Sequence, residues 1–162
     1  MVNNIKVTVR KTKLADSSLI KAVFNQHWGG DFIISLGKIH KPEALDGFIA
    51  EINGRCKGLI TFNITKQGLE IVSLNSFMEK KGVGTTLVKR VISFAKKEKI
   101  KRLWLVTTND NLNAFRFYQK RGFILKKVYP NSLAPYRKLK PILLIGQNNI
   151  PLRDEIELEM RL

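Results

Sequence analysis

Two glycines, Gly82 and Gly84, stand between a predicted strand and a long amphipathic helix. Glycine adopts backbone conformations that other residues avoid, and its missing side chain lets the backbone approach a bound group closely. The first N–H groups of the following helix lack partners within the helix and point, with the positive end of its dipole, toward such a group. The sequence therefore predicts a turn whose main-chain amides bind a phosphate. The residues expected to form this site are Lys80, Lys81, Gly82, Val83, Gly84 and Thr85.

Two other phosphate-binding motifs do not fit this turn. The chain has no Gly-x-x-x-x-Gly-Lys-Ser/Thr sequence, so a P-loop is unsupported. The segment 82–87 lacks the third glycine of a dinucleotide-binding fingerprint. A strand-to-helix turn without a ligand is the alternative interpretation of this motif taken alone.

The length and composition indicate one globular domain spanning residues 1–162. Hydrophobic residues make up 44% of the chain, as in folded proteins. No apolar run approaches the roughly 20 residues that cross a bilayer, and the first residues show no apolar signal-peptide core. We therefore expect a cytoplasmic protein. The single Cys56 excludes an internal disulfide, and since His40 has no ligand partners we expect no metal site.

The charge balance is strongly basic. The chain has 29 Lys and Arg against 13 Asp and Glu, a formal net charge of +16. Such a surface attracts polyanions and steers anionic ligands inward, so a nucleic-acid- or ribosome-associated binding protein is an alternative function. Against this alternative, the sequence has no zinc-finger spacing, no ribonucleoprotein aromatic signature and no uninterrupted basic arm. The lysines could equally serve only to solvate the surface.

The spacing of apolar residues predicts the order of strands and helices. The predicted strands are 5–9, 48–52, 58–64, 69–74, 103–106 and 123–129. The predicted helices are 17–25, 83–97 and 112–120. Asn53-Gly54 predicts a tight hairpin turn, although residues 55–57 could lengthen the loop. The stretch 31–45 gives no clear prediction.

The C-terminal residues predict a closing strand at 156–160. Its apolar residues are Ile156, Leu158 and Met160, and they alternate with Glu155, Glu157 and Glu159. Strict alternation of this kind predicts a strand with one buried face and one solvated face. The complete order of elements favours an α/β fold with one mixed sheet and helices on both of its faces.

Two motifs in this order resemble the GCN5-related N-acetyltransferase (GNAT) family. That family has a turn of the form Gln/Arg-x-x-Gly-x-Gly/Ala before its central helix, and the same register here is 79–84. Glu79 occupies the Gln/Arg place and brings a negative charge, which Lys80 and Lys81 beside it offset. The family's next motif is Asn-x-x-Ala-x-x-x-Tyr-x-x-x-Gly-Phe. Every place of this second motif is filled, by Asn111, Ala114, Tyr118, Gly122 and Phe123.

The resemblance covers about 48–123, and the segments 137–141 and 150–159 are similar to a poorly characterised bacterial branch of that family. It implies a mainly antiparallel, twisted sheet, acetyl-CoA as the acyl donor, and a homodimer. The family holds the pantetheine arm of the coenzyme beside its fourth strand, where Leu74, Asn75 and Ser76 match. Asn111 would contact the arm from the other side, and it could also cap the following helix.

Tyr118 is the predicted acid. When an amine attacks a thioester, the departing thiolate needs a proton or a hydrogen bond. A phenol with a pKa of about 10 can supply either at neutral pH, and Tyr118 falls in register with the family's acid. The alternative role is an aromatic residue that packs its helix against the core.

The attacking amine must also lose a proton. Glu70, at the start of the strand that leads to the thioester, is the first candidate base, and Glu51 is the second. Either glutamate could instead be a solvated strand residue. His27 and Trp28 follow the first helix, where the family builds its acceptor site; Trp28 would form an apolar wall and His27 could act as a base. Cys56 has no paired histidine, so we expect no role for it as a nucleophile.

The sequence therefore predicts an N-acetyltransferase that transfers an acetyl group from acetyl-CoA to a primary amine by direct attack in a ternary complex. A catalytically idle acetyl-CoA-binding protein is a further alternative. The sequence does not identify the acceptor amine. If the basic surface extends into the acceptor site, it disfavours polycationic acceptors.

Overall fold

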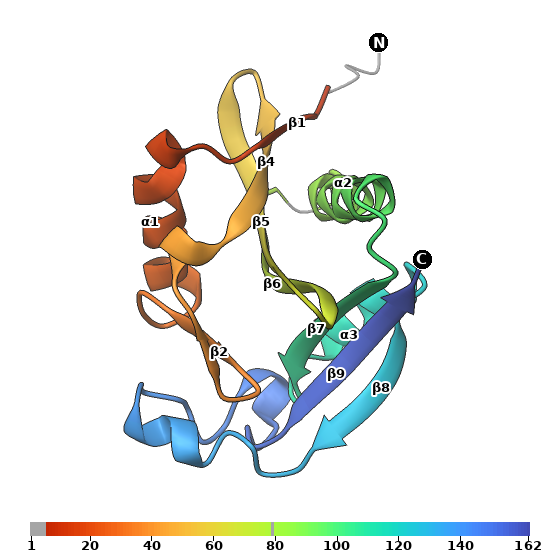
Figure 1. The fold of residues 1–162 in the computed structure, drawn as a ribbon. Coiled ribbons are helices and arrows are strands. Elements are labelled where there is room, and N and C mark those ends of the chain that lie inside the picture. Colours follow the sequence, from red (N-terminus) through yellow and green to blue (C-terminus); the bar gives the residue numbers. More distant parts are fainter. Residues whose placement is uncertain (1–5, 79) are drawn as a thin grey trace.

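The computed structural model describes residues 6–78 and 80–162, so Glu79 and the first residue of the strand predicted at 5–9 lie outside the described residues. The strands are β1 (Thr8–Lys11), β2 (Ile33–Ser35), β3 (Lys38–His40), β4 (Asp46–Ile52), β5 (Arg55–Thr65), β6 (Gly68–Ser76), β7 (Arg102–Thr108), β8 (Ile124–Tyr129) and β9 (Glu155–Arg161). The α-helices are α1 (Ser17–His27), α2 (Val83–Lys97) and α3 (Leu112–Gln119) (Figure 1). Within the described ranges no helix has both the length and the apolar character needed to cross a bilayer.

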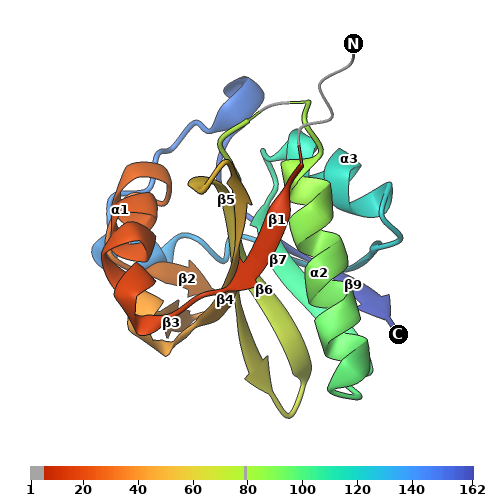
Figure 2. The ribbon, with the colours of Figure 1, turned by 90° about the horizontal axis from the view of Figure 1, so that it is seen from above.

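Seven strands form one mixed sheet in the order β1-β4-β5-β6-β7-β9-β8. The pair β6–β7 is parallel, and every other neighbouring pair in this sheet is antiparallel. Helix α1 lies on one face of the sheet, and α2 and α3 lie on the other (Figure 2). The predicted mixed α/β sheet with helices on both faces is therefore confirmed.

Each face of the sheet has its own hydrophobic core. The larger core joins the sheet to α2 and α3, and the smaller one joins it to α1. Helix α2 buries Leu87, Val88 and Val91 and exposes Lys89 and Arg90. This is the arrangement that its amphipathic sequence predicts.

The β4–β5 hairpin has a two-residue turn, the shorter of the two turns considered from the sequence. Ile52 pairs with Arg55, so the turn contains only Asn53 and Gly54. Their φ angles are 51° and 72°, which is the conformation that Asn-Gly favours in two-residue hairpins. The alternative of a loop lengthened by residues 55–57 is wrong, because β5 begins at Arg55.

The prediction that β9 has a solvated face is wrong. Glu155, Glu157 and Glu159 are all buried, with exposed fractions of 1%, 7% and 3%. Strand β9 lies between β7 and β8 rather than at the sheet edge, and Arg102 of β7 pairs with both Glu157 and Glu159. These three carboxylates can be buried because the partly buried guanidinium of Arg102 and other polar groups bind them.

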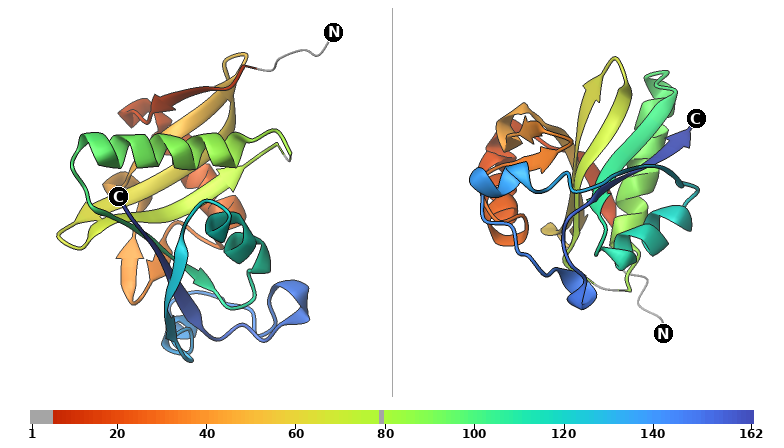
Figure 3. Two further views of the ribbon diagram at one scale, coloured as in Figure 1. Left: turned by 90° about the vertical axis from the view of Figure 1, so that its right-hand side faces the viewer. Right: turned by 90° about the horizontal axis from the view of Figure 1, so that it is seen from below.

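The stretch 31–45, for which the sequence gave no clear prediction, contains the β2–β3 hairpin. Ser35 pairs with Lys38 across a turn of Leu36 and Gly37. The chain between β8 and β9, residues 130–154, folds back toward this hairpin and the end of α1 (Figure 3). These two segments cover the same face of the sheet as α1, over the ends of β6, β7 and β9.

Candidate active site

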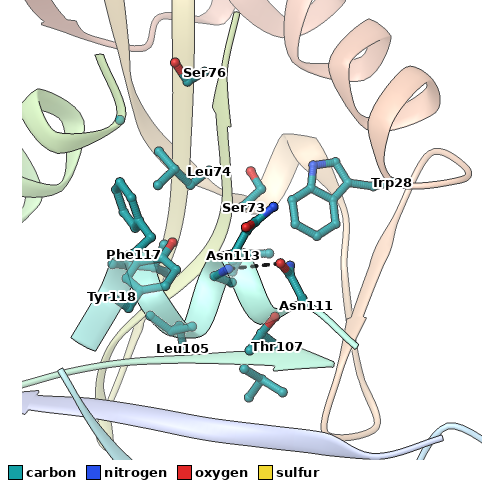
Figure 4. A pocket seen from close by; sticks show the side chains of 15 residues that line it. Trp28, Ser73, Leu74, Ser76, Leu105, Thr107, Asn111, Asn113, Phe117 and Tyr118 are labelled. Carbon is teal, nitrogen blue, oxygen red and sulfur yellow. Dashed lines mark hydrogen bonds between the residues drawn. The ribbon is translucent and has the colours of Figure 1, made fainter. Parts of the chain in front are cut away.

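Strands β6 and β7 separate after a short parallel ladder. Within the described ranges this ladder joins Leu69–Ile71 to Leu103–Leu105 and goes no further. Beyond it a cavity of about 470 Å³ lies between the diverging strands, walled on one side by α3. We call this the strand-gap cavity (Figure 4). It is lined by Trp28, 71–74, Ser76, Gly84, 105–107, Asn111, Asn113, Ala114, Phe117 and Tyr118.

The glycine turn lies at one end of the strand-gap cavity, beside the end of β6. Gly82 has φ 72°, a left-handed conformation, and it immediately precedes the first residue of α2. Its carbonyl accepts the Thr86 N–H at 2.9 Å and the Thr86 hydroxyl at 3.0 Å. Helix α2 therefore begins directly after this turn, as the sequence predicts, so its first N–H groups lie beside the turn. Lys80 and Lys81, next to the turn, are exposed.

Arg121 holds the start of α2 against α3, a contact that the sequence motifs did not indicate. Its guanidinium donates to the Thr85 hydroxyl and to the Phe117 carbonyl, the latter at 2.6 Å. The same group stacks 3.5 Å from the centre of the Phe117 ring. Burial lowers the pKa of Arg121. Thr85, a predicted phosphate contact, therefore has its side chain engaged with Arg121.

Tyr118 points into the strand-gap cavity from α3 (Figure 4). Its ring packs edge-on against Phe117 and Phe123, with ring centres 5.1 and 5.3 Å away, and only 7% of the residue is exposed. Burial raises the pKa of the Tyr118 phenol well above its usual value. The hydroxyl is therefore protonated at neutral pH and able to donate.

Asn111 begins α3 and also lines the strand-gap cavity. Its Oδ1 accepts the Ala114 N–H at 3.0 Å, which caps the helix (Figure 4). The capping role considered from the sequence is therefore present. The side-chain amide group of the same residue still lies against the cavity.

The end of β6 carries the other predicted coenzyme contacts. Leu74 and Ser76 line the strand-gap cavity. The Asn75 Oδ1 accepts the indole N–H of Trp28 at 2.9 Å, a contact between β6 and the end of α1 that the sequence did not indicate. Trp28 therefore stands fixed on the side of the cavity opposite Tyr118 (Figure 4).

A second cavity of about 400 Å³ adjoins the first on the face covered by α1 and the β2–β3 hairpin. The two share Trp28, Ile71, Val72, Val106, Thr107 and Asn111. We call it the acidic cavity, because Glu70 and Glu155 line it. His27 lies exposed at its edge, with its ring centre 5.7 Å from that of Phe77.

Glu70 is buried, with 2% of its surface exposed, so the alternative of a solvated strand residue is wrong. It accepts the Ser35 hydroxyl at 2.6 Å, and its other oxygen lies 3.5 Å from the Nε2 of His40. The other candidate base, Glu51, is bound by the Arg10 guanidinium at 2.9 Å and lines neither cavity. Of the two candidate bases, Glu70 thus lines a cavity that adjoins the strand gap, and Glu51 does not.

Glu155 is the residue of this site that sequence reasoning missed. It accepts the Leu36 N–H at 3.0 Å and the Tyr136 hydroxyl at 3.3 Å. The sequence did contain a signal for an acidic site, because three closely spaced glutamates are unusual in a chain of net charge +16. The alternation of these glutamates with apolar residues suggested a solvated strand face instead. The described ranges hold no group of three or more His, Cys, Asp or Glu placed to bind a metal ion.

Lys140 closes the acidic cavity from the segment between β8 and β9. Its ammonium group donates to the carbonyls of Trp28 and Phe32, both at 2.7 Å. Burial lowers the pKa of Lys140, and nearby Asp31 opposes this shift. Cys56 lies on β5 away from both cavities, and its half-buried thiol has a pKa raised by burial.

The sequence matches the model of the acetyltransferase (GNAT) family over residues 17–123. The chain therefore belongs to this family. Among individual proteins it is similar to the uncharacterized protein YdhI of Bacillus subtilis (strain 168). The two are 43% identical over 135 residues, which is 82% of this chain and 84% of YdhI.

Solved structures share the fold. One is a Bacillus subtilis acetyltransferase in complex with CoA, with a TM-score of 0.73 and 20% identity over 97% of this chain and 99% of that one. Another is a GNAT family acetyltransferase from Elizabethkingia anophelis with acetyl-CoA bound. Its TM-score is 0.70, with 22% identity over 96% of this chain and 98% of that one.

Proposed function

We propose that this protein is a single-domain N-acetyltransferase that transfers the acetyl group of acetyl-CoA to a primary amine within one ternary complex. The observation that carries the proposal is that the strand-gap cavity and the acidic cavity adjoin and share lining residues. The strand-gap cavity holds the Tyr118 side chain, and the acidic cavity next to it holds Glu70. A donor to a leaving thiolate and an acceptor for an ammonium proton thus flank the place where the two substrates meet.

The coenzyme fits the strand-gap cavity by its own chemistry. Its diphosphate would accept hydrogen bonds from the main-chain amides of 81–85, at the positive end of α2. Lys80 and Lys81 would add positive charge nearby. The pantetheine arm carries amide groups, which would pair with the backbone of 74–76 where β7 has moved away, and Asn111 would face the arm from α3.

The reaction forms a C–N bond and breaks the C–S bond of the thioester. The protonated acceptor amine loses two protons overall. One leaves through Glu70, directly or through a water, and frees the lone pair for attack. The other ends on sulfur, because Tyr118 donates to the departing thiolate and regains a proton from the new amide nitrogen. A phenol with its usual pKa of about 10 is protonated at neutral pH, and burial, which raises the pKa of Tyr118, leaves it so.

Glu70 is the base that the geometry favours over His27. Glu70 lines the acidic cavity, and the next two residues of β6, Ile71 and Val72, line both cavities. His27 lies at the exposed edge of the acidic cavity instead. Trp28 forms the wall between coenzyme and acceptor, held there by Asn75.

A ligand-binding and turnover experiment tests this function. We expect micromolar acetyl-CoA to raise the melting temperature at physiological salt more than heparin does, since a specific ligand stabilises the folded state by mass action. We also expect thiol release from acetyl-CoA that depends on an added primary amine, with the N-acetylated product detected by mass spectrometry. Equal shifts from heparin and acetyl-CoA would indicate general polyanion binding. Stabilisation by acetyl-CoA without amine-dependent thiol release across a broad amine panel would indicate a catalytically idle protein.

A further inference from the structure

The acidic cavity differs in charge from the rest of the protein. Glu70 and Glu155 are 2% and 1% exposed and both line it. In residues 6–78 and 80–162, neither carboxylate has a lysine or arginine partner within ion-pair distance. Their neighbours Glu157 and Glu159 do have such partners, in Arg102 and, for Glu159, also Lys126.

Neutral donors bind both of these carboxylates, neither of which has a lysine or arginine partner. The consecutive residues Ser35 and Leu36, at the tip of the β2–β3 hairpin, donate to Glu70 and to Glu155 respectively. Leu36 has φ 46°, a left-handed conformation that a branched side chain rarely adopts. The hairpin therefore accepts an unfavourable backbone conformation at the residue whose N–H binds Glu155. Neutral donors support a carboxylate without cancelling its charge.

The remaining charged groups of the cavity do not neutralise this pair. Lys140 is the one lysine or arginine among the described lining residues, and two of its N–H bonds are committed to the carbonyls of Trp28 and Phe32. His27 lies at the exposed edge. His40 does not line the cavity, and its imidazole lies 3.5 Å from Glu70, so it leaves Glu155 without a basic partner. Most of the other lining side chains are apolar, including Ile33, Leu133, Ile142 and Leu152.

We propose that the acceptor is a small dication, in which one primary amine reacts at Glu70 and a second cationic group is bound by Glu155 across an apolar linker. This inference rests on the proposed function. A buried carboxylate without a counter-ion is costly unless a cation completes it, and here the cation would come with the substrate. The cavity of about 400 Å³ has the size of a small-molecule site. The net positive charge of the chain therefore does not extend into this cavity. A basic surface would disfavour polycationic acceptors only if it did, so it does not argue against a dication here.

Matched acceptors test the inference. Cadaverine is compared with the amino alcohol of the same length, and putrescine with its own amino alcohol, in acetyl transfer and in calorimetric binding. We expect kcat/KM for the better diamine to exceed that for its amino alcohol at least about tenfold, as for a desolvated charge pair. Glu155→Gln keeps the shape of the side chain and an acceptor for the Leu36 N–H. We expect it to reduce the ratio of kcat/KM for the diamine to kcat/KM for the amino alcohol to about one.

Glu157→Gln is the matched control. This neighbouring glutamate is also buried on β9, but it pairs with Arg102 and does not line the acidic cavity. We expect this variant to keep the diamine preference, with melting temperatures reporting the folding of both variants. Equal use of diamine and amino alcohol by the wild-type protein, or an unchanged preference in Glu155→Gln, would overturn the inference. If no amine is acetylated but diamines bind in a manner that depends on Glu155, the cation site stands and the proposed function fails.

Discussion

The two cavities that meet where β6 and β7 diverge are built from different kinds of wall. The strand-gap cavity takes nearly all its lining from two stretches, 71–84 and 105–118, and presents backbone amides, two asparagines and a phenol. The acidic cavity takes its lining from segments spread between His27 and Glu155, and presents two buried carboxylates. The first is encoded locally, as motifs next to helix starts. The second exists only when segments that are distant in sequence pack together.

The buried Glu157 and Glu159 of β9 depend on long-range ion pairing, and the largest expected effect follows from removing Arg102, which pairs with both. Arg102→Met leaves Glu157 and Glu159 buried without their guanidinium, which we expect to lower the free energy of unfolding by about 3 kcal/mol. Lys126→Met removes only a half-exposed partner of Glu159, with an expected loss below about 1 kcal/mol. Urea unfolding at neutral pH measures both losses. Equal losses would mean that the buried row does not depend on Arg102.

The pH dependence of Arg102→Met sharpens this test. Hydrogen bonding from Arg102 is the main cause that lowers the pKa of Glu159. The ionised form therefore stabilises the folded protein above the usual glutamate pKa of about 4.3, and this contribution is lost as the pH falls through the lower folded value. In the variant Glu159 loses the main cause of its lowered pKa. The stability difference between wild type and variant should therefore shrink on acidification.

The contrast between the two cavities also explains what the sequence could predict. The glycine turn and the capping Asn111 lie next to helix starts, and Tyr118 lies seven residues after Asn111 on the same short helix, so patterns within short segments indicated all three. The role of Glu155 depends on Leu36 and Tyr136, which are distant in sequence. Alternation in β9 correctly predicted a strand, but it could not show that another segment covers the charged face.

The chemistry assigned to the strand-gap cavity is tested by Tyr118→Phe. Removing the donor to the leaving thiolate should lower kcat about 100-fold, the scale of general acid catalysis, with little change in the KM for acetyl-CoA. Tyr129→Phe is the control, because the Tyr129 hydroxyl binds Glu157 and lies outside both cavities. Steady-state thiol release measures both variants. An unchanged kcat in Tyr118→Phe would remove this residue from the reaction.

The glycine turn allows a closely matched pair of substitutions. Gly82 and Gly54 both have φ 72°, and a Cβ at either would meet no atom within 4 Å. Gly82→Ala and Gly54→Ala should therefore lose similar stability, about 1 kcal/mol for a left-handed alanine. Only Gly82→Ala should weaken acetyl-CoA binding, about tenfold if the turn amides bind its diphosphate. Calorimetric titration tests this, and equal affinities in the two variants would count against the phosphate site.

The smallest predicted effect concerns the closure of the acidic cavity. Lys140→Met removes the two hydrogen bonds that tie the segment between β8 and β9 to the end of α1. We expect the acceptor KM to rise about fivefold, a fraction of what charged hydrogen bonds can contribute, with the KM for acetyl-CoA unchanged. Parallel rises in both KM values would show that the two cavities are not independent.

A crystal structure of the complex with CoA tests the central claim most directly, because it shows where the coenzyme lies. We predict its diphosphate on the main-chain amides of 82–85, its pantetheine arm between β6 and β7, and its sulfur within hydrogen-bond distance of the Tyr118 hydroxyl. A diphosphate bound elsewhere, or a sulfur remote from Tyr118 and the acidic cavity, would contradict this account.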